Sequence, residues 1–438
     1  MHRVRVLAKQ PCAHAVQRRS ASTKPGPLAG IRVLEVGQFI AGPYASTLLG
    51  WYGAEVIKIE PLGAGDQIRQ FRDVDSAGQS WWSYSINRNK RSVAMDLRKP
   101  EARVLVKKLA TEWADVLLEN FRPGQMDKWG LGSDELAALN PDLVYTSVTG
   151  YGRTGPYASR PGFASVCEAM GGFRYVNGFP APNGGGGPER AVRPNLSMGD
   201  TLAGINGALG TILALYARDS GRLKGQRGQV VDASIVESVF GIMEGVLPDY
   251  SGAGIVRQPS GSTVTGIVPT NTYRCKDGKS VVVGANSDQL FKRLFTQMGR
   301  ADMAADPRFA HNQGRVEHVA LLDATIEAWT LTKTADEVVA EVTKAEVPNG
   351  LIYSIEDVVN DPHYQARGVL EPVAIPTLER PLLVPALGPK LSDTPGQTRW
   401  AGPRVGEHTR EVLCGLLNLS EAEYNALLRA NVVEASAA

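Results

Sequence analysis

The sequence predicts an α/β protein with a doubly wound, mostly parallel sheet and a second, smaller α+β domain. Short apolar strands alternate with helical stretches over the first 240 residues, a pattern typical of parallel sheets covered by helices on both faces. Near residue 250 this alternation gives way to a hairpin followed by helices. The length of 438 residues, with 43% hydrophobic and 21% charged residues, fits a soluble globular chain of two or three domains.

The first half of the chain supplies the strands and helices of the large domain. Pro100 suits the first turn of a helix, and Val104, Leu105 and Leu109 follow with helical spacing. Buried strands are expected at residues 31–36, 55–60, 116–118, 143–148 and 229–233, and helices at 44–51, 100–113, 200–218 and from 234 onward. Residues 151–199 are rich in proline and glycine, and we expect them to be irregular.

The second half predicts the smaller domain and a returning tail. Residues 272–275 and 280–283 flank the turn Lys276-Asp277-Gly278 and predict a hairpin. Ser420 is the expected N-cap of a final helix. Further helices are expected at 287–299, 311–329 and 333–345, with a strand-and-turn region at 369–387. The expected division is a leader at 1–26, a large domain at 27–250, a small domain at 260–365, and a segment at 370–438 that returns to the large domain.

The first 26 residues form a distinct basic leader. They hold six basic residues and no acid, whereas the rest of the chain is mildly acidic. A basic, acid-free segment that contains Arg and Ser is typical of a mitochondrial transit peptide, and the alternative is a disordered basic tail. Because the body lacks an excess of basic residues, nucleic acid is not an expected partner. The longest apolar run, residues 208–217, is shorter than the roughly 18 residues that span a bilayer, so no membrane partner is expected either.

Cysteine and histidine are placed unfavourably for metal or redox chemistry. Cys12, Cys167, Cys275 and Cys414 lie far apart and form no C-x-x-C pair. The six histidines all lie outside residues 15–310. We therefore expect no metal site.

One glycine motif imitates a dinucleotide site. Residues 150–155 match G-x-G-x-x-G after a predicted strand, but such a site needs a helix to open there. Pro156 and Pro161 oppose that helix, so nicotinamide or flavin binding is not expected.

Asp200 is the strongest single candidate for chemistry. It begins a predicted helix that carries no other charge until Arg218. A carboxylate at a helix N-terminus is expected to stay ionised. Asp200 is therefore either an ordinary N-cap or a carboxylate nucleophile of the kind that forms acyl intermediates. The small residues Gly199, Ala203, Gly204 and Gly207 would allow a ligand or a second backbone to approach closely.

Basic and amide residues gather at the ends of predicted strands. Asn87-Arg88-Asn89-Lys90 precede one strand, and Asn120-Phe121-Arg122 follow another, with Lys128 a turn later. Ligands of open α/β sheets bind beyond the carboxyl ends of the strands, and cations beside an aromatic ring suit a phosphorylated, nucleotide-like ligand. The alternative is a solvated charged surface, which the spacing does not exclude.

Several motifs in order carry a family resemblance. The chain from about residue 28 to the tail resembles the class III CoA-transferases, the family of formyl-CoA transferase and carnitine CoA-transferase. The segments that carry it are residues 34–36, 41–43, 53–61, 65–66, 89–92, 119–124, 150–152, 199–200, 211–215, 228–234 and 406–409.

The resemblance implies a fold, a mechanism and site residues. It implies a Rossmann-like large domain in an interlocked homodimer, with Asp200 as the nucleophile that passes through an aspartyl anhydride and an aspartyl-CoA thioester. CoA and its acyl thioester enter as substrates, and no metal or tightly bound cofactor is needed. The positions that match CoA-holding segments are Gln38, Phe39, Ile40, Ala41, Asn87, Arg88, Asn89, Lys90, Asn120, Phe121, Arg122, Lys128 and Tyr151. Gly261 and Ser262 are the nearest match to a loop that supplies oxyanion donors.

The same fold includes 2-methylacyl-CoA racemases, which need an acid and a base on opposite faces of the α-carbon. Phe163 stands where their histidine would fall, and Ala164 replaces an aspartate common at the next position. Residues 261–269 resemble the subgroup acting on dicarboxylic acids, represented by mitochondrial succinate–hydroxymethylglutarate CoA-transferase. Succinyl-CoA is then the expected donor and a glutarate-, hydroxymethylglutarate- or itaconate-like acid the acceptor, its second carboxylate held by Arg69, Arg72 or Arg153. A racemase and a catalytically idle CoA-binding protein remain alternatives.

Overall fold

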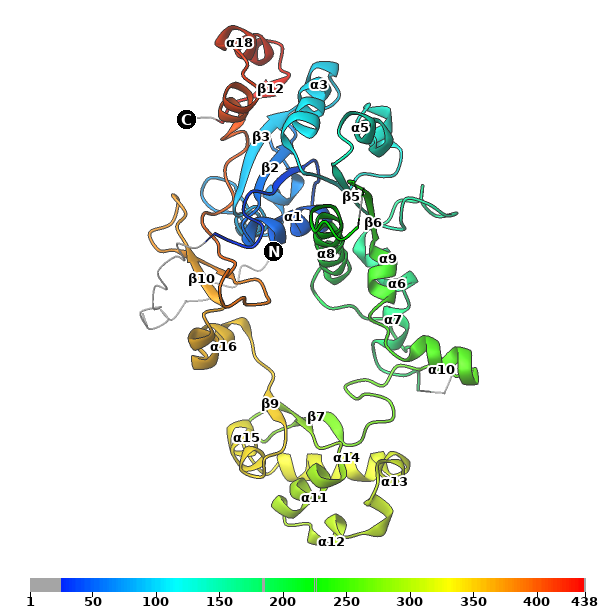
Figure 1. Ribbon diagram of the computed structural model, residues 1–438. Helices are drawn as coiled ribbons and strands as arrows, with labels where there is room; N and C mark the ends of the chain where they lie inside the picture. The colour runs from blue at the N-terminus through cyan, green and yellow to red at the C-terminus, as the bar shows by residue number, and fades with distance from the viewer. Residues whose placement is uncertain (1–24, 183–185, 224, 226, 437–438) are drawn as a thin grey trace.

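The computed structural model describes residues 25–182, 186–223, 225 and 227–436, so almost all of the expected leader lies outside it. Two lobes are joined by two chain segments, one leaving the large lobe near residue 254 and one returning near residue 352 (Figure 1). A mostly parallel seven-stranded sheet organises the large lobe, and a small antiparallel sheet organises the other. The expected α/β class with a doubly wound sheet is confirmed.

The large sheet has the order β12-β3-β2-β1-β4-β5-β6, in which β12 alone runs antiparallel. The strands are β1 (Arg32–Glu35), β2 (Glu55–Glu60), β3 (Lys90–Met95), β4 (Val116–Glu119), β5 (Val144–Thr149), β6 (Val230–Ser234) and β12 (Val433–Glu434). The order 3-2-1-4-5-6 of the parallel strands is that of dinucleotide-binding doubly wound sheets. The chain changes direction across the sheet between β1 and β4, and the crevice beyond their carboxyl ends is the usual ligand site.

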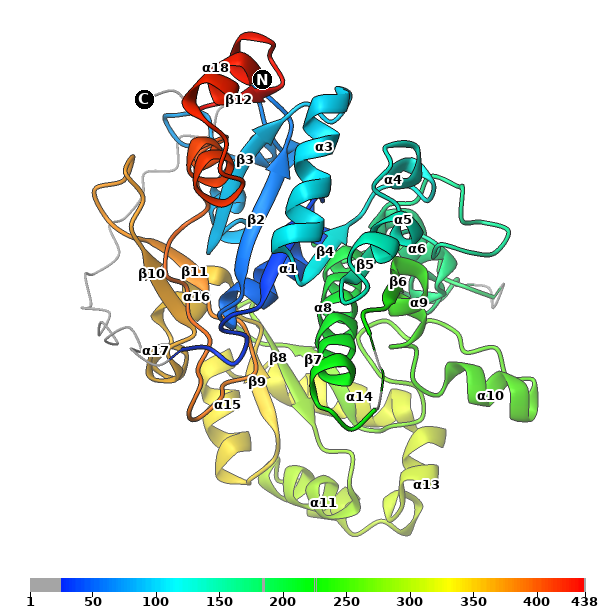
Figure 2. The same cartoon turned by 45° about the horizontal axis from the view of Figure 1, so that its top comes forward.

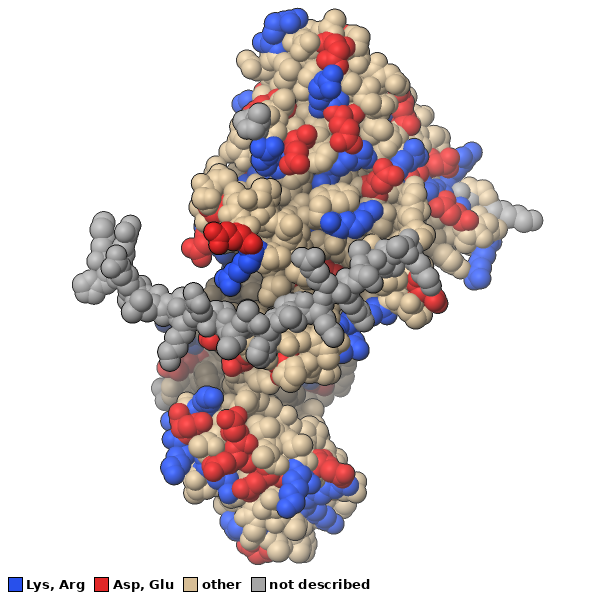
Figure 3. Space-filling view, turned by 90° about the vertical axis from the view of Figure 1, so that its left-hand side faces the viewer, with Lys and Arg blue, Asp and Glu red and all other residues tan. Residues whose placement is uncertain are grey.

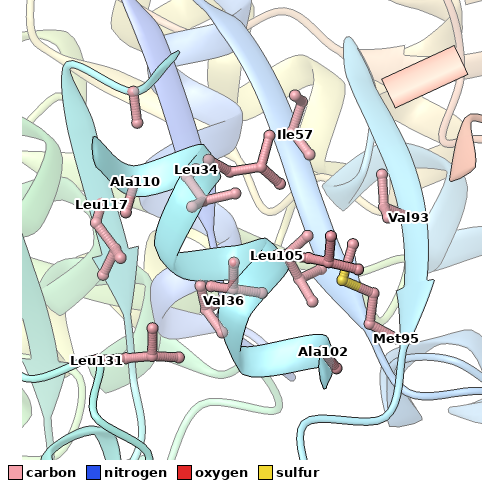
Figure 4. Close-up of a cluster of buried hydrophobic side chains, with 14 of the residues drawn as sticks. Leu34, Val36, Ile57, Val93, Met95, Ala102, Leu105, Ala110, Leu117 and Leu131 are labelled. Atoms are coloured by element: carbon pink, nitrogen blue, oxygen red, sulfur yellow. The ribbon is translucent and has the colours of Figure 1, made fainter. Parts of the chain in front are cut away.

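Helices cover both faces of this sheet. Leu34 points toward α3 (Pro100–Lys108), which continues as a π-helical turn, η2 (Leu109–Trp113), and Figure 4 shows Leu105 of α3 and Ala110 of η2 packed there with residues of β1 to β4. Its neighbour Val33 points to the opposite face, where α1 (Ala41–Trp51) and α8 (Met198–Asp219) pack. This alternation follows from the period of two along a strand, and burial on both faces explains why the strands read as continuous apolar runs.

The remaining elements of the large lobe are short. They are η1 (Gln67–Gln70), α2 (Trp81–Ile86), α4 (Gln125–Lys128), α5 (Ser133–Leu139), α6 (Ala164–Met170), α7 (Phe173–Val176), α9 (Ile235–Phe240) and α10 (Val246–Ala253). The expectation of an irregular stretch at 151–199 is wrong where α6 and α7 lie. Both helices are shorter than the usual signal, and Gly171 and Gly172 separate them, so no helical period builds up.

The small lobe is a three-stranded antiparallel sheet packed against helices. Its buried residues run from Val268 to Val347. The elements are β7 (Thr270–Arg274), β8 (Ser280–Gly284), β9 (Asn349–Leu351), α11 (Asp288–Gln297), α12 (Ala301–Ala304), η3 (Pro307–Phe309), α13 (Asn312–Glu317), α14 (Val319–Thr330) and α15 (Ala335–Lys344). The expected hairpin is confirmed. The single helix expected at 311–329 is wrong, because the backbone leaves helical geometry at His318 and divides it in two.

The C-terminal segment lies along the large lobe (Figure 2). It contains α16 (Ile355–Asn360), α17 (Pro362–Arg367), the hairpin β10 (Leu370–Val373) and β11 (Leu382–Pro385), a π-helical stretch η4 (Glu411–Leu416), and α18 (Glu421–Arg429). β12 then pairs with β3, and the backbone N–H of Ala94 donates to Thr409 Oγ1, 315 residues further along the chain. Ser420 caps α18 as expected, in a capping box with Glu423.

Candidate functional site

The crevice between β1 and β4 brings two of the predicted CoA-binding segments together. The backbone N–H of Gln38 donates to Asn120 Oδ1, and Asn120 Nδ2 donates back to the Gln38 carbonyl, both at 2.8 Å. The ring of Phe121 packs edge-on against Trp129 at 5.1 Å, while Arg122 and Lys128 are exposed. These segments therefore meet at the carboxyl edge of the sheet, where the strand order places a ligand.

Asp200 lies in the first turn of α8, with its carboxylate accepting the backbone N–H of Ala164 at the start of α6. Gly199 fits where α8 crosses α6 and α9: a Cβ there would lie 3.0 Å from Ile235 Cγ2 and 3.3 Å from Glu168 Cγ. The crossing is thus tight, and it holds Asp200 beside α6. Gly204 serves the same purpose against α1, since its Cβ would lie 2.8 Å from the Ala41 carbonyl oxygen. Gly199 and Gly204 therefore allow close packing of α8 against other helices of the same chain.

The carboxyl group of Asp200 departs from the expectation that it stays ionised. Burial, and then the charge of Glu168, raise its pKa from 3.8 to about 7, against the opposing effects of Arg193 and the Ala164 N–H. The effect of the helix N-terminus, which favours the ionised carboxylate, is therefore smaller than the opposing effects of burial and of the negative charge on Glu168. A carboxylate poised near neutral pH in a dry site is typical of catalytic groups.

Glu168 is a residue that the sequence did not indicate as part of the site. It is fully buried on α6 and accepts the backbone N–H of Gly199 at 3.2 Å. Arg174 Nη2 donates to its other oxygen at 3.3 Å, and Arg193 Nε lies 3.6 Å from the same oxygen. A sequence reader sees a lone acid in an irregular stretch. The short helix α6 and the loop before α8 are what bring it to Asp200.

Tyr151 follows β5 on the same side of the lobe. Its hydroxyl donates to Met170 Sδ at 3.3 Å, and a Cβ at Gly162 would lie 2.8 Å from its ring. Cys167 donates to the Gly150 carbonyl oxygen at 3.3 Å, and burial, with the charge of Asp200, raises the pKa of its thiol to about 11. The thiol therefore stays protonated at neutral pH, in keeping with a buried filler rather than a nucleophile.

Asn87 to Lys90 lie apart from this cluster. Asn87 to Asn89 precede β3 and Lys90 is its first residue, so their backbone lies at the amino end of that strand, while Lys90 Nζ donates to the Pro43 carbonyl oxygen in the segment after β1 at 2.8 Å. Arg88 donates to the Pro385 carbonyl, and Asn89 joins the Gly50 carbonyl to residues 397–400. Asn87 Nδ2 is buried without a partner among the described residues. Their contact with CoA stays a prediction.

A network of buried charges lies beneath the loop after β1. Lys58 Nζ lies 2.6 Å from Glu35 and 2.8 Å from Asp66, and donates to the Gly37 carbonyl oxygen at 2.8 Å. Asp66 in turn accepts the backbone N–H of Phe39, a residue with φ of 65°. Lys90 joins Glu35 at 2.8 Å, and Arg69 pairs with Glu60 at 2.7 Å. The ions thus fix the path of the loop that carries Gln38 and Phe39.

Four other predicted residues already have partners within the chain: Gly261, Ser262, Arg69 and Arg153. Gly261 donates its N–H to the Gly178 carbonyl oxygen and packs on the ring of Phe179, and Ser262 donates to Asn271. Their role as oxyanion donors stays a prediction. Arg69 is buried in its pair with Glu60, and Arg153 donates to Ser133 Oγ and lies over the ring of Tyr145.

The loop that imitates a dinucleotide motif opens no helix: after β5 the next helix begins at Ala164. In the described part of the chain, no group of three His, Cys, Asp or Glu residues is arranged to hold a metal ion. None of the helices that the structure describes has the length and apolar character to cross a membrane. Figure 3 shows acidic and basic side chains interspersed over one face of both lobes.

Known proteins share both this sequence and this fold. The chain is 43% identical over 94% of its length to succinyl-CoA–D-citramalate CoA-transferase of Chloroflexus aurantiacus, which it covers completely. It is 30% identical to succinyl-CoA:glutarate CoA-transferase of the mouse, over 93% of this chain and 90% of that protein. A crystal structure of a CaiB/BaiF family protein from Brucella suis superposes with a TM-score of 0.77 at 31% identity, covering 90% of this chain and all of that one.

The family model for CoA-transferase family III matches residues 28–409, a span that includes the sheet, the crevice between β1 and β4, and Asp200. Sequence and fold therefore agree that this chain belongs to CoA-transferase family III and is a class III CoA-transferase.

Proposed function

We propose that this protein moves CoA from succinyl-CoA to a small dicarboxylic acid, with Asp200 as the nucleophile. The observation that carries the proposal is the Asp200 carboxyl group itself: it lies at the start of α8 beside buried Glu168, with a pKa near neutrality. A group that is half ionised near pH 7 combines nucleophilicity with a substantial reactive fraction. The alternative reading of Asp200 as a plain N-cap has less support, because no side-chain capping bond is formed at the start of α8.

The proposed chemistry needs two exchanges at the same carboxylate. Asp200 attacks the carbonyl carbon of the donor thioester, the C–S bond breaks, and CoA leaves as the thiolate. The thiolate then attacks the aspartyl carbonyl of the resulting anhydride and releases the donor acid. The acceptor carboxylate attacks the aspartyl-CoA thioester, the thiolate departs again, and its return to the acceptor carbonyl frees Asp200. No proton is gained or lost overall.

The crevice between β1 and β4 supports a place for CoA. Gln38 to Ala41 and Asn120 to Arg122 line the carboxyl edge there, and Lys128 and Arg122 are exposed cations that suit phosphate. The ring of Phe39 lies 6.1 Å from that of Phe163, whose neighbour Ala164 donates to Asp200. A thioester bound along this edge would thus point its acyl end toward Asp200.

The relatives support succinyl-CoA as donor and a dicarboxylate as acceptor. The Chloroflexus and mouse relatives are named for succinyl-CoA with citramalate, malate or glutarate. All three acceptors carry a second carboxylate, as does the succinyl group. The acceptor we propose is therefore a short dicarboxylic acid, of which glutarate, hydroxymethylglutarate and itaconate are further examples.

An exchange assay tests the proposal. The enzyme is incubated with succinyl-CoA and glutarate or citramalate, and the new thioester is detected by mass. Asp200→Asn is expected to lower exchange at least a thousandfold while CoA still binds, and hydroxylamine is expected to modify Asp200 only when donor is present. Glu189→Gln, an exposed change in the loop before α8, serves as control. Full turnover in Asp200→Asn refutes the nucleophile. Binding without turnover identifies an idle CoA-binding protein, and α-proton exchange on a 2-methylacyl-CoA identifies a racemase.

We further propose that the enzyme works as a homodimer. Ile205, Leu209, Leu213 and Tyr216 form one face of α8 and are each 43–58% exposed. A continuous apolar stripe of this length is unusual on a monomer surface. Light scattering on the purified protein is expected to give twice the mass of the 47.0 kDa chain. Leu209→Glu with Leu213→Glu should shift it toward the monomer, and an unchanged mass removes this face from the interface.

The basic leader supports a mitochondrial location, which we also propose. It lies outside the described residues apart from its last two positions. Residues 1–26 fused to a fluorescent protein are expected to direct it to mitochondria, whereas the same segment with its arginines and lysines changed to glutamine should leave it in the cytosol. Cytosolic fluorescence of the unaltered fusion contradicts the proposal.

A further inference from the structure

A cavity of about 340 Å³ opens at the N-terminus of α8, the helix whose first turn carries the proposed nucleophile. It is lined by Arg72, Arg193, Pro194, Asn195, Leu196 and Ser197. Ser197 is the N-cap residue of α8, and Asp200 follows within the next turn, a rise of roughly 5 Å along the helix axis. The cavity is therefore within the span of a short carbon chain that has one end at Asp200.

Arg72 supplies an unused positive charge to this cavity. Its guanidinium makes no hydrogen bond or ion pair with another residue in the part of the chain that the structure describes. It lies instead over the ring of Trp82, with 4.4 Å from its Cζ to the ring centroid. Stacking on an aromatic ring holds a guanidinium in place and leaves its N–H edge available.

The backbone at Arg72 is held in a costly conformation. Its φ is 64°, in the left-handed region that a side chain with a Cβ adopts at a cost of about 1 kcal/mol or more. Trp82 packs in the same hydrophobic cluster as Ile40 and Ile68, so the loop after β1 and the loop of Arg72 are anchored on the same cluster. Strain that is retained in a rigid setting is typical of functional positions.

Arg193 supplies the second cation. Its Nη2 donates to the Leu196 carbonyl oxygen at 2.7 Å, which keeps the side chain folded over the cavity. It also lies 3.6 Å from Glu168, and its charge lowers the pKa of Asp200. Arg193 thus touches both the cavity and the proposed nucleophile's surroundings.

The charges at this place do not balance. Arg72, Arg174 and Arg193 bring three positive charges, against the carboxyl groups of Glu168 and Asp200. Acylation of Asp200 removes its negative charge and leaves two cations in excess. A second carboxylate on the acyl group or on the acceptor would restore the balance through charge-assisted hydrogen bonds.

Three aromatic rings in contact connect the segment of Arg72 with the segment that donates to Asp200. The ring of Phe39 lies 5.6 Å from that of Phe71, the residue before Arg72, and 6.1 Å from that of Phe163, the residue before Ala164. The methylene groups of a short dicarboxylic acid suit such rings, since they gain by leaving water. The reacting carboxylate of the acid would then lie at Asp200, its methylene groups along the aromatic rings, and its second carboxylate at the arginines.

We propose that Arg72 and Arg193 bind the distal carboxylate of the dicarboxylic substrate while its other end reacts at Asp200. This inference rests on the proposed function, and it assigns substrate class to one cavity. The same two arginines receive the free carboxylate of the succinyl group and that of the acceptor in turn, because each acid forms its own anhydride with the same Asp200 carboxylate.

Paired acceptors of equal length test the assignment. The kcat/KM of the full-length enzyme is measured with glutarate and with pentanoate, which has a methyl group in place of one carboxylate. The ratio is expected to favour glutarate by about ten- to hundredfold, the range for a charge-assisted contact. Arg72→Gln should reduce that ratio about tenfold by raising the KM for glutarate, with kcat changed less, and Arg72→Lys should restore part of it. Arg274→Gln, an exposed change in the small lobe, should leave the ratio unchanged.

The outcomes separate this inference from the proposed function. Transfer with an unchanged glutarate preference in both Arg72→Gln and Arg193→Gln overturns the arginine site and leaves the function standing. If no acceptor supports transfer, calorimetric titration with glutarate still decides the site: binding by the unaltered protein that weakens about tenfold in Arg72→Gln supports it, and equal binding or none overturns it.

Discussion

Replacing Glu168 by glutamine should move the acid side of the enzyme's pH profile. Glu168 is fully buried, and its carboxylate is the second cause, after burial, of the raised pKa of Asp200. Glutamine keeps the shape of the side chain and can still accept the Gly199 N–H. The substitution therefore removes one negative charge and changes little else, and it frees Arg174 and Arg193 to act on Asp200.

The expected shift can be worked from the structure. The pKa of Asp200 is about 7, roughly three pH units above its ordinary value of 3.8, and burial is the larger cause. Because burial is the larger cause of this rise, we assign about one pH unit to the charge of Glu168, which corresponds to about 1.4 kcal/mol. At pH 6 the ionised fraction of Asp200 should thus rise from about a tenth to about half.

The assay is kcat/KM for succinyl-CoA between pH 5 and 9, with CoA release read in a single turnover. For the unaltered enzyme, log kcat/KM should rise with pH at unit slope and reach a plateau above pH 7, because the nucleophile must lose its proton. Glu168→Gln should reach its plateau about one unit earlier, and Glu189→Gln should follow the unaltered enzyme. An acid limb that stays in place, or that moves to higher pH, refutes the assigned electrostatics.

Three further changes have defined outcomes. Asp200→Asn should raise the free energy of unfolding by about 2–4 kcal/mol at pH 8, because the raised pKa of Asp200 makes its ionisation in the folded protein costly. This gain in stability should be absent below about pH 4, increase up to pH 7 and then stay level, and thermal melts across this pH range measure it. Gly199→Ala should lower kcat more than tenfold and cost about 1–3 kcal/mol in urea titrations, since its Cβ would press on Ile235 and Glu168; an active, equally stable variant contradicts the tight crossing. Lys58→Met should cost about 3–5 kcal/mol, measured the same way, by leaving Glu35 and Asp66 buried without their shared partner, whereas a neutral result shows that water reaches the network.

The fold was largely predictable because its strands follow simple rules. Residues 55–60 form β2 as expected, and the hairpin of β7 and β8 surrounds the expected turn. Because these strands are buried on both faces of the sheet, their sequences are continuous apolar runs that are easy to recognise. Helices α6 and α7 were missed because seven and four residues are too few to show a helical period.

The site was predictable only where residues lie in recognisable segments. Asp200 stood out as a lone charge at a helix start, whereas Glu168 reaches it from the short helix α6 and Arg193 from the loop before α8, and no local sequence pattern reveals either approach. The raised pKa of Asp200 is likewise a property of packing, since burial and Glu168 cause it. Lys58 and Asp66 lie within segments that carry the family resemblance. Their ion pair joins a strand to a loop, however, and could not be predicted from either segment alone.

The pairing of β12 with β3 bears on how the chain is made. A ribosome that adds about 5–20 residues per second needs roughly 15–60 s between Ala94 and the Thr409 hydroxyl that satisfies its N–H. Throughout that interval β3 remains an unpaired edge strand, while β4, β5 and β6 are added on the other side of β1, and it can pair with a neighbouring nascent chain. Residues 406–434 thus cover the edge of β3, and a truncation before residue 406, which spares every residue near Asp200, should still produce insoluble protein, as sedimentation of the cell lysate can show.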